Sequence, residues 1–248
     1  MKKNLFTLLM VFGCVGLFAA CSSSSKDEVV EIDSPLIGTW NLNEAGSVIF
    51  NWEAIEGVSD DDFALIIPSE LAGGDEDVPF PIQDLVALVK QSILAPKLGE
   101  NLKAITFLEN GNITAQYFDG VDKNWKESPE GLATYRALNK NKLSVQLHAK
   151  AIIEEAGITD EQSVAAMTKY MKEPFVVNYD LVKDDNELDC FVDKAFVAKY
   201  MQELLPLLDS DVIPEAFKPL VESFARQIKA LFEQTEKFEL GLSLERAK

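Results

Sequence analysis

Side chains able to act as a nucleophile or a general base are scarce in this sequence. His148 is the only histidine, and on the expected strand it shares the polar side with Ser144 and Gln146. Such a histidine is more often a surface or hydrogen-bonded structural residue than a base, and no strand–turn–helix nucleophile elbow accompanies it. The Gly73-Gly74 pair precedes acidic residues, which would repel a phosphate. We therefore expect a chain that is not an enzyme and needs no cofactor.

Three acidic clusters, at residues 60–62, 75–77 and 184–187, raise the question of calcium. None has the glycine at position six and the glutamate at position twelve of an EF-hand loop. We interpret them as acids at a helix N-terminus, a solvated loop and a hairpin turn, so no metal site is expected. Carboxylate pairs for glycoside hydrolysis could come from any of the 41 acidic residues, so a hydrolase remains a third hypothesis.

Two tryptophans are the candidate ligand-binding residues. Trp52 and Trp125 lie near the ends of expected strands, and Trp125 stands in the polar context of residues 122–127. An exposed tryptophan among polar residues can stack on a sugar or anchor a partner protein, although a ring folded back over the barrel rim is commoner.

The N-terminus carries a targeting signal. Lys2 and Lys3 precede an apolar run that ends in Leu17-Phe18-Ala19-Ala20-Cys21. This resembles a bacterial lipoprotein signal peptide, in which the cysteine is lipidated and becomes the new N-terminus. The run falls short of the roughly 18 apolar residues that a membrane-spanning helix wants. We expect a signal peptide over 1–20, a lipid anchor at Cys21 that attaches the protein to a membrane, and a flexible tether over 21–34.

The polar tether bears on localisation. Its Ser-Lys-Asp-Glu stretch at residues 25–28 resembles the export signal that sends lipoproteins of Gram-negative gut anaerobes to the outer face of the outer membrane. An ordinary solvated linker has the same composition, so both interpretations stand. The sequence predicts an outer membrane lipoprotein, on the periplasmic face or the cell surface.

Charge excludes some partners. The full chain has a formal net charge of −18, and removal of Lys2 and Lys3 with the signal peptide makes the mature protein more acidic still. Nucleic acid binding needs clustered Lys and Arg, and the sequence has no basic run. Anionic lipid head groups would also be repelled, so acyl chains would hold the protein at the membrane.

Cysteine use argues against a disulfide and against zinc. Cys14 leaves with the signal peptide and Cys21 is the acylation site, so only Cys190 of the three cysteines remains in the mature chain. Period-two alternation places Cys190 on the apolar side with Leu188 and Val192, which favours a buried, unreactive thiol.

Two periodicities follow the tether. Alternation predicts nine strands, and Asn110-Gly111 has the composition of a two-residue hairpin turn with two positive φ angles. The strands are expected at 37–42, 47–52, 102–109, 112–118, 132–138, 142–149, 175–182, 187–192 and 237–244. Helical patterns interrupt them from Ile82 to a stop at Pro96, from Asp160 to Met171 after an N-cap at Thr159, and over 195–208 and 214–235. Hairpin strands with helices inserted between them indicate an antiparallel α+β domain over residues 35–248.

The first strand carries a fold signature. Gly38-Thr39-Trp40 resembles the Gly-x-Trp signature of lipocalins and other calycins, and the 105–113 hairpin resembles that of small lipocalin-like lipoproteins. With its signal peptide the chain is similar to the calycin-like lipoproteins of unknown function found in gut bacteria. The resemblance implies an up-and-down barrel whose closed end is covered by Trp40, with Gly38 beneath it. It departs from a plain lipocalin at helical insertions near 55–100, 150–173 and 193–235, which would plug or cap the barrel mouth.

The resulting hypothesis is a calycin-like barrel of about eight to nine strands that binds a partner molecule without catalysis. The inward candidates are apolar, so the first hypothesis is a lipid-anchored envelope protein that binds an uncharged, apolar small ligand in or at the mouth of the barrel. The alternative is an interaction or scaffold subunit with a filled barrel that docks on another envelope protein. The inward candidates are Trp40, Ile105, Phe107, Ile113, Leu143, Val145, Leu147, Phe238, Leu240 and Leu242.

Overall fold

The computed structural model describes residues 35–42, 47–69, 73–120, 122–139, 141–198 and 227–248. The expected signal peptide, Cys21 and the tether lie outside the described residues. The chain divides into two compact units. The first contains described residues up to Ile49, together with Leu94–Val192 and Gly241–Lys248, and the second contains Phe50–Ile93 and the described part of Asp193–Leu240. The second unit therefore includes much of two predicted insertions, and a single domain over 35–248 stays a prediction.

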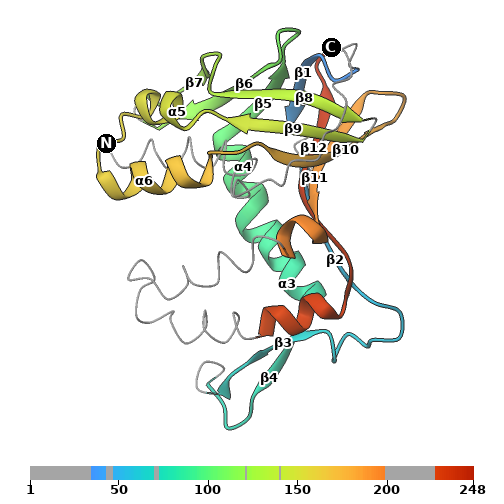
Figure 1. Ribbon diagram of the computed structural model, residues 1–248. Coiled ribbons are helices and arrows are strands. Elements are labelled where there is room, and N and C mark those ends of the chain that lie inside the picture. Colours follow the sequence, from blue (N-terminus) through green and yellow to red (C-terminus); the bar gives the residue numbers. More distant parts are fainter. Residues whose placement is uncertain (1–34, 43–46, 70–72, 121, 140, 199–226) are drawn as a thin grey trace. The chain divides into compact units, whose positions relative to one another are not determined.

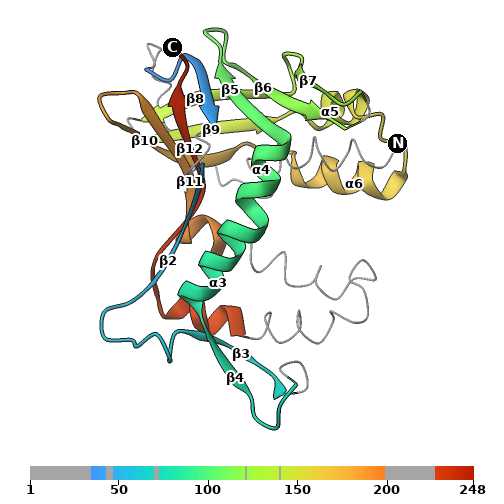
Figure 2. The same ribbon diagram turned by 180° about the vertical axis from the view of Figure 1, so that it is seen from behind.

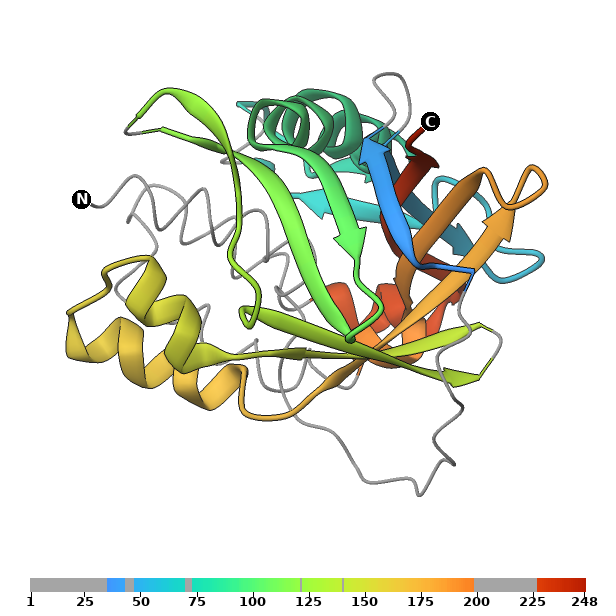
Figure 3. The same cartoon turned by 90° about the horizontal axis from the view of Figure 1, so that it is seen from above.

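A closed antiparallel barrel forms the first unit, which confirms the predicted α+β, calycin-like fold class (Figures 1 and 3). Eight strands follow one another round it, and β1 pairs with β12 to close the ring. In order they are β1 (Gly38–Leu42), β5 (Leu102–Phe107), β6 (Asn112–Asp119), β8 (Ala133–Asn139), β9 (Lys142–Leu147), β10 (Phe175–Val182), β11 (Glu187–Asp193) and β12 (Thr235–Arg246).

Two further strands extend this sheet, and two form a sheet of their own. Strand β2 (Val48–Ala54) pairs with β12, and β7 (Asn124–Glu127) pairs with β6. Strands β3 (Ala64–Ile67) and β4 (Val78–Pro81) form a separate hairpin in the second unit. All nine predicted strands are present with small shifts at their ends, whereas β3, β4 and β7 were missed.

The β5–β6 hairpin differs from its prediction in the type of turn. Gly111 has a φ of +80°, but Asn110 does not have a positive φ. The Gly111 N–H donates to the Leu108 carbonyl at 3.0 Å, and the Leu108 N–H donates to the Asn112 carbonyl at 2.9 Å. These bonds define a three-residue loop that ends in a left-handed glycine. The hairpin is confirmed and the two-residue turn was wrong.

The helices also differ in detail from the sequence patterns. Those with both ends described are α3 (Ile82–Val89), the π-helical η1 (Lys90–Leu94), α4 (Ala95–Asn101), α5 (Ala149–Glu155) and α6 (Glu161–Tyr170). Residues 194–198 and 227–233 are helical as well. The predicted stop at Pro96 was wrong, because the helical backbone continues from α3 through the π-helical η1 into α4, and Pro96 lies in the first turn of α4. The N-cap of α6 is Asp160 and not Thr159, since the Asp160 carboxylate accepts the Ser163 N–H at 2.8 Å. Most of the helical pair expected beyond residue 195 lies outside the described residues.

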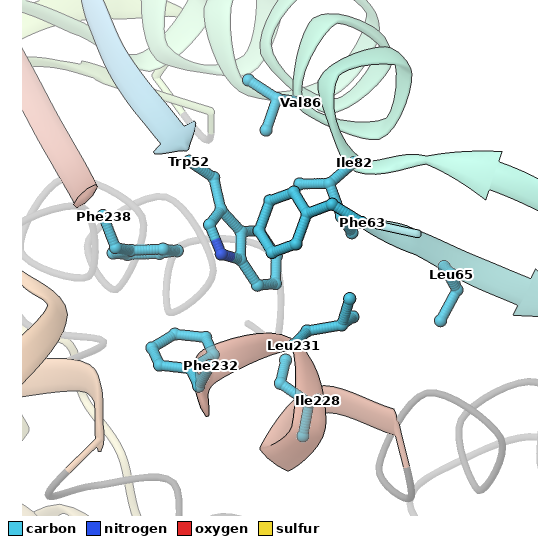
Figure 4. Close-up of a cluster of buried hydrophobic side chains, with 9 residues drawn as sticks. All are labelled: Trp52, Phe63, Leu65, Ile82, Val86, Ile228, Leu231, Phe232 and Phe238. Atoms are coloured by element: carbon cyan, nitrogen blue, oxygen red, sulfur yellow. The ribbon is translucent and has the colours of Figure 1, made fainter. Parts of the chain in front are cut away.

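The core of the second unit is an aromatic cluster around Trp52 (Figure 4). Its ring lies 6.0 Å from Phe63, 5.3 Å from Phe232 and 5.4 Å from Phe238, measured between ring centroids. Edge-to-face and tilted arrangements of this kind are favourable beyond the burial of area alone. Five aliphatic side chains complete the cluster: Leu65, Ile82, Val86, Ile228 and Leu231.

Candidate functional site

Trp40 on β1 is enclosed by distant parts of the chain. The indole is fully buried, its Nε1–H donates to the Leu36 carbonyl at 2.7 Å, and the guanidinium carbon of Arg246 lies 4.3 Å from the ring centroid. Gly38 has a φ of +126°, a backbone conformation that residues other than glycine rarely adopt. The structure thus gives the burial of Trp40 and the positive φ of Gly38, and the roles that the resemblance implies for them stay expectations.

Arg246 bonds to two distant segments of the backbone at this site, and sequence reasoning missed it. Its guanidinium donates to the backbone carbonyls of Pro35, Ile37 and Asp185 at 2.5, 3.4 and 3.0 Å. A planar cation held by carbonyls on one edge can stack its face on an indole. No sequence pattern marks this arginine, because its partners are backbone atoms on two distant segments.

Apolar side chains line the inward face of the barrel. Cross-strand register places Trp40, Ile105 and Ala115 on one face, and continues that face through Phe107, Ile113 and the later strands. Fifteen large side chains on this face expose at most 8% of their surface. Leu42 and Leu181, which register pairs with Leu244 and Leu188 on the same face, are only partly buried. A void large enough for water would leave the surrounding side chains accessible. Exposure as low as that of the fifteen residues indicates that other atoms pack closely against them. The fifteen are Trp40, Ile105, Phe107, Ile113, Tyr135, Leu143, Val145, Leu147, Phe175, Val177, Tyr179, Leu188, Val192, Leu242 and Leu244.

Two predicted inward residues lie elsewhere. Phe238 is a member of the Trp52 cluster, and Leu240 packs against the same cluster. The other eight predicted residues are in the barrel and are buried. Period two identified the buried side of β12 correctly, but alternation cannot tell which of two cores a long strand contacts.

The two candidate ligand-binding tryptophans have different surroundings. Trp52 is 3% exposed, and its Nε1–H donates to the Thr235 hydroxyl at 2.7 Å, as a core residue would. Trp125 lies on β7 and is 40% exposed. Its ring is edge-on to Phe118 at 5.6 Å, and Lys126 beside it bonds to the carboxylates of Asp119 and Asp122. Only Trp125 offers an accessible ring.

His148 and Cys190 are held in structural surroundings. His148 Nε2 lies 3.1 Å from the Thr134 hydroxyl, and the residue precedes α5 as its N-cap. Burial, together with the nearby carboxylates of Asp189 and Asp180, raises the pKa of the Cys190 thiol to about 12. A thiol with so high a pKa is almost entirely protonated at neutral pH and is a poor nucleophile.

The acidic clusters fall on loops and turns, apart from Glu187, which begins β11. The expected helix N-terminus at 60–62 was wrong, because these residues form a turn before β3. Asp62 accepts a hydrogen bond from the Ser59 hydroxyl at 2.6 Å, and Asp77 accepts the Ser69 N–H at 2.8 Å. Asp184 and Asp185 have positive φ angles in the β10–β11 turn. Among the residues that the structure describes, no three His, Cys, Asp or Glu side chains gather as metal ligands would.

Within the described ranges, no helix combines the length and the apolar composition needed to cross a membrane.

Comparisons with protein-family models, with curated proteins and with solved structures found no match for this chain.

Proposed function

We propose that this chain is a lipid-anchored interaction subunit of the bacterial cell envelope, in which a filled barrel serves as a rigid scaffold that docks on another envelope protein. The observation that supports it is the near-complete burial of the inward-facing barrel side chains. An eight-stranded barrel holds either packed side chains or one small ligand, and packed side chains leave a ligand nothing to contact.

The rival function is binding of an uncharged, apolar small ligand at the barrel mouth. It is supported by the composition of the interior, where the large inward side chains given above are aliphatic and aromatic and the charge on that face is Arg246 against Trp40. A ligand there would have to displace packed side chains, at a cost that its own burial would need to exceed.

The two functions are separated by native mass spectrometry of protein purified from its own host. An interaction subunit should carry no small molecule, and it should not bind an apolar fluorescent probe. A co-purifying apolar molecule that competes with the probe would instead establish ligand binding.

The anchor is tested on its own. Thioether acylation needs the sulfur of Cys21, so Cys21→Ser should lose the acyl mass and leave the membrane fraction or stay uncleaved. Equal membrane retention of the variant, with no acyl mass on the natural protein, would contradict the lipoprotein proposal.

A further inference from the structure

The β3–β4 hairpin of the second unit is apolar on both faces. Its two strands read Ala-Leu-Ile-Ile and Val-Pro-Phe-Pro, with no polar side chain in either. Register pairs Ile66 with Pro79 on one face and Ile67 with Val78 on the other. Ile66 is 39% exposed and Val78 is 46% exposed. Figures 1 and 2 show this apolar hairpin projecting from α3.

The edges of the apolar hairpin are closed to further strands. On β3, the Gln227 side chain accepts the Ile66 N–H at 2.7 Å and donates to the Ile66 carbonyl at 2.9 Å. On β4, Pro79 and Pro81 have no N–H to offer. Both devices prevent edge-to-edge pairing. A partner would therefore recognise the exposed side chains of the hairpin and not its backbone.

Acidic triplets stand at both ends of the apolar hairpin. Residues 60–62 come just before β3, at the end where Ala64 pairs with Pro81, and residues 75–77 come just before β4, at the end where Ile67 pairs with Val78. All six aspartate and glutamate residues are exposed. No described lysine or arginine forms a salt bridge with them. The exposed apolar side chains are therefore Ile66 on one face of the hairpin and Val78 on the other, and negative charge stands at both ends.

We propose that the apolar hairpin is the surface with which this subunit docks on its partner, and that the partner is a protein whose apolar contact strip is flanked by Lys or Arg. Complementary charge at the two ends would set the register and accelerate association, and apolar contact between them would supply affinity. A second copy is disfavoured because each chain has a net charge of −18 and would bring like charges together. An anionic membrane surface is disfavoured for the same reason.

This inference rests on the proposed function and is tested in the native host with the full chain. The photo-crosslinking residue p-benzoylphenylalanine replaces Val78, and in a matched control it replaces Val176, which is 38% exposed on β10. Unchanged urea unfolding of both variants verifies that they fold. The crosslinked peptides are then sequenced, and the crosslinking is repeated with Asn or Gln at all six acidic positions.

The expected result is one protein adduct at position 78 and none at position 176. The sequenced contact should be an apolar stretch with Lys or Arg on both sides. Neutralising the acidic triplets should lower the yield of the crosslinked adduct at position 78 by about fivefold. A rise in salt that shortens the Debye length from about 10 Å to about 3 Å should lower this yield by a similar factor.

Four outcomes would overturn the docking surface: no protein adduct at position 78, an adduct within this chain or with a second copy, an adduct with lipid alone, or a yield indifferent to the six charges. In each case the interaction subunit would still stand if native mass spectrometry finds the barrel empty. A small molecule in the barrel would refute the proposed function instead.

Discussion

Replacement of Trp40 by alanine tests the closed end of the barrel most directly. The indole is fully buried, and truncation of such a side chain costs about 3–5 kcal/mol through lost transfer energy and the cavity left behind. The Arg246 guanidinium 4.3 Å above the ring also loses a cation–π contact worth about 0.5–2 kcal/mol. We therefore expect a loss in the upper half of that range. Since whole domains are stable by about 5–15 kcal/mol, the change should be large in urea unfolding followed by circular dichroism.

Trp125→Ala is the matched control, because this ring is 40% exposed and has Phe118 as its aromatic neighbour. Its loss should stay below about 1 kcal/mol. A loss below about 1 kcal/mol for Trp40→Ala as well would refute the reasoning, since it would mean that the ring does not fill the end of the barrel.

Three further substitutions or measurements probe the two cores. A Cβ on Gly241 would overlap the Cys190 carbonyl oxygen and lie 2.6 Å from the Phe191 Cα, so Gly241→Ala should cost about 3 kcal/mol or more in urea unfolding. A Cβ on Gly99 in α4 would have no heavy atom within 4 Å, so Gly99→Ala should stabilise by about 0.5–1 kcal/mol. A larger loss of stability for Gly99→Ala than for Gly241→Ala would contradict the argument. Thr235→Val removes the acceptor of the Trp52 Nε1–H and should cost about 1–3 kcal/mol, whereas Thr235→Ser should keep the bond, with tryptophan fluorescence as the second readout. Cys190 should resist alkylation at pH 8 in the native protein and react in denaturant, because its folded pKa of about 12 exceeds the ordinary value of 9.0. The contribution of this raised pKa to the free energy of unfolding is present below pH 9 and declines as pH rises toward 12. Fast alkylation of the native protein would contradict the prediction, because it would show that the thiol is accessible.

The strands of the barrel were predictable because each carries its own signal. Alternating side chains such as Leu242 and Leu244 on β12 repeat with the period of a half-buried strand, which is a local property of the chain. The strands β3 and β4 escaped prediction because the signal there was contradictory. Pro79 and Pro81 argue against a strand, because proline has no N–H to donate to a neighbouring strand. Both lie on β4, which is an edge strand of a two-stranded sheet, and proline is tolerated at such an edge.

Sequence alone determined the element types, the antiparallel class and the Gly38-Trp40 signature, since these follow from periodicity, turn composition and one short motif. Tertiary structure alone decided which residues meet. Closure of the barrel pairs Trp40 with Arg246, more than 200 positions away in the chain, and no local pattern encodes that contact. The three tryptophans show the same division. Trp40 is buried in the barrel, Trp52 is buried in the core of the second unit and Trp125 is exposed. Their burial depends on which distant segments pack round them. The packing inside the barrel is likewise a property of all eight strands together, because it depends on the sum of inward side-chain volumes within a ring that only long-range pairing closes.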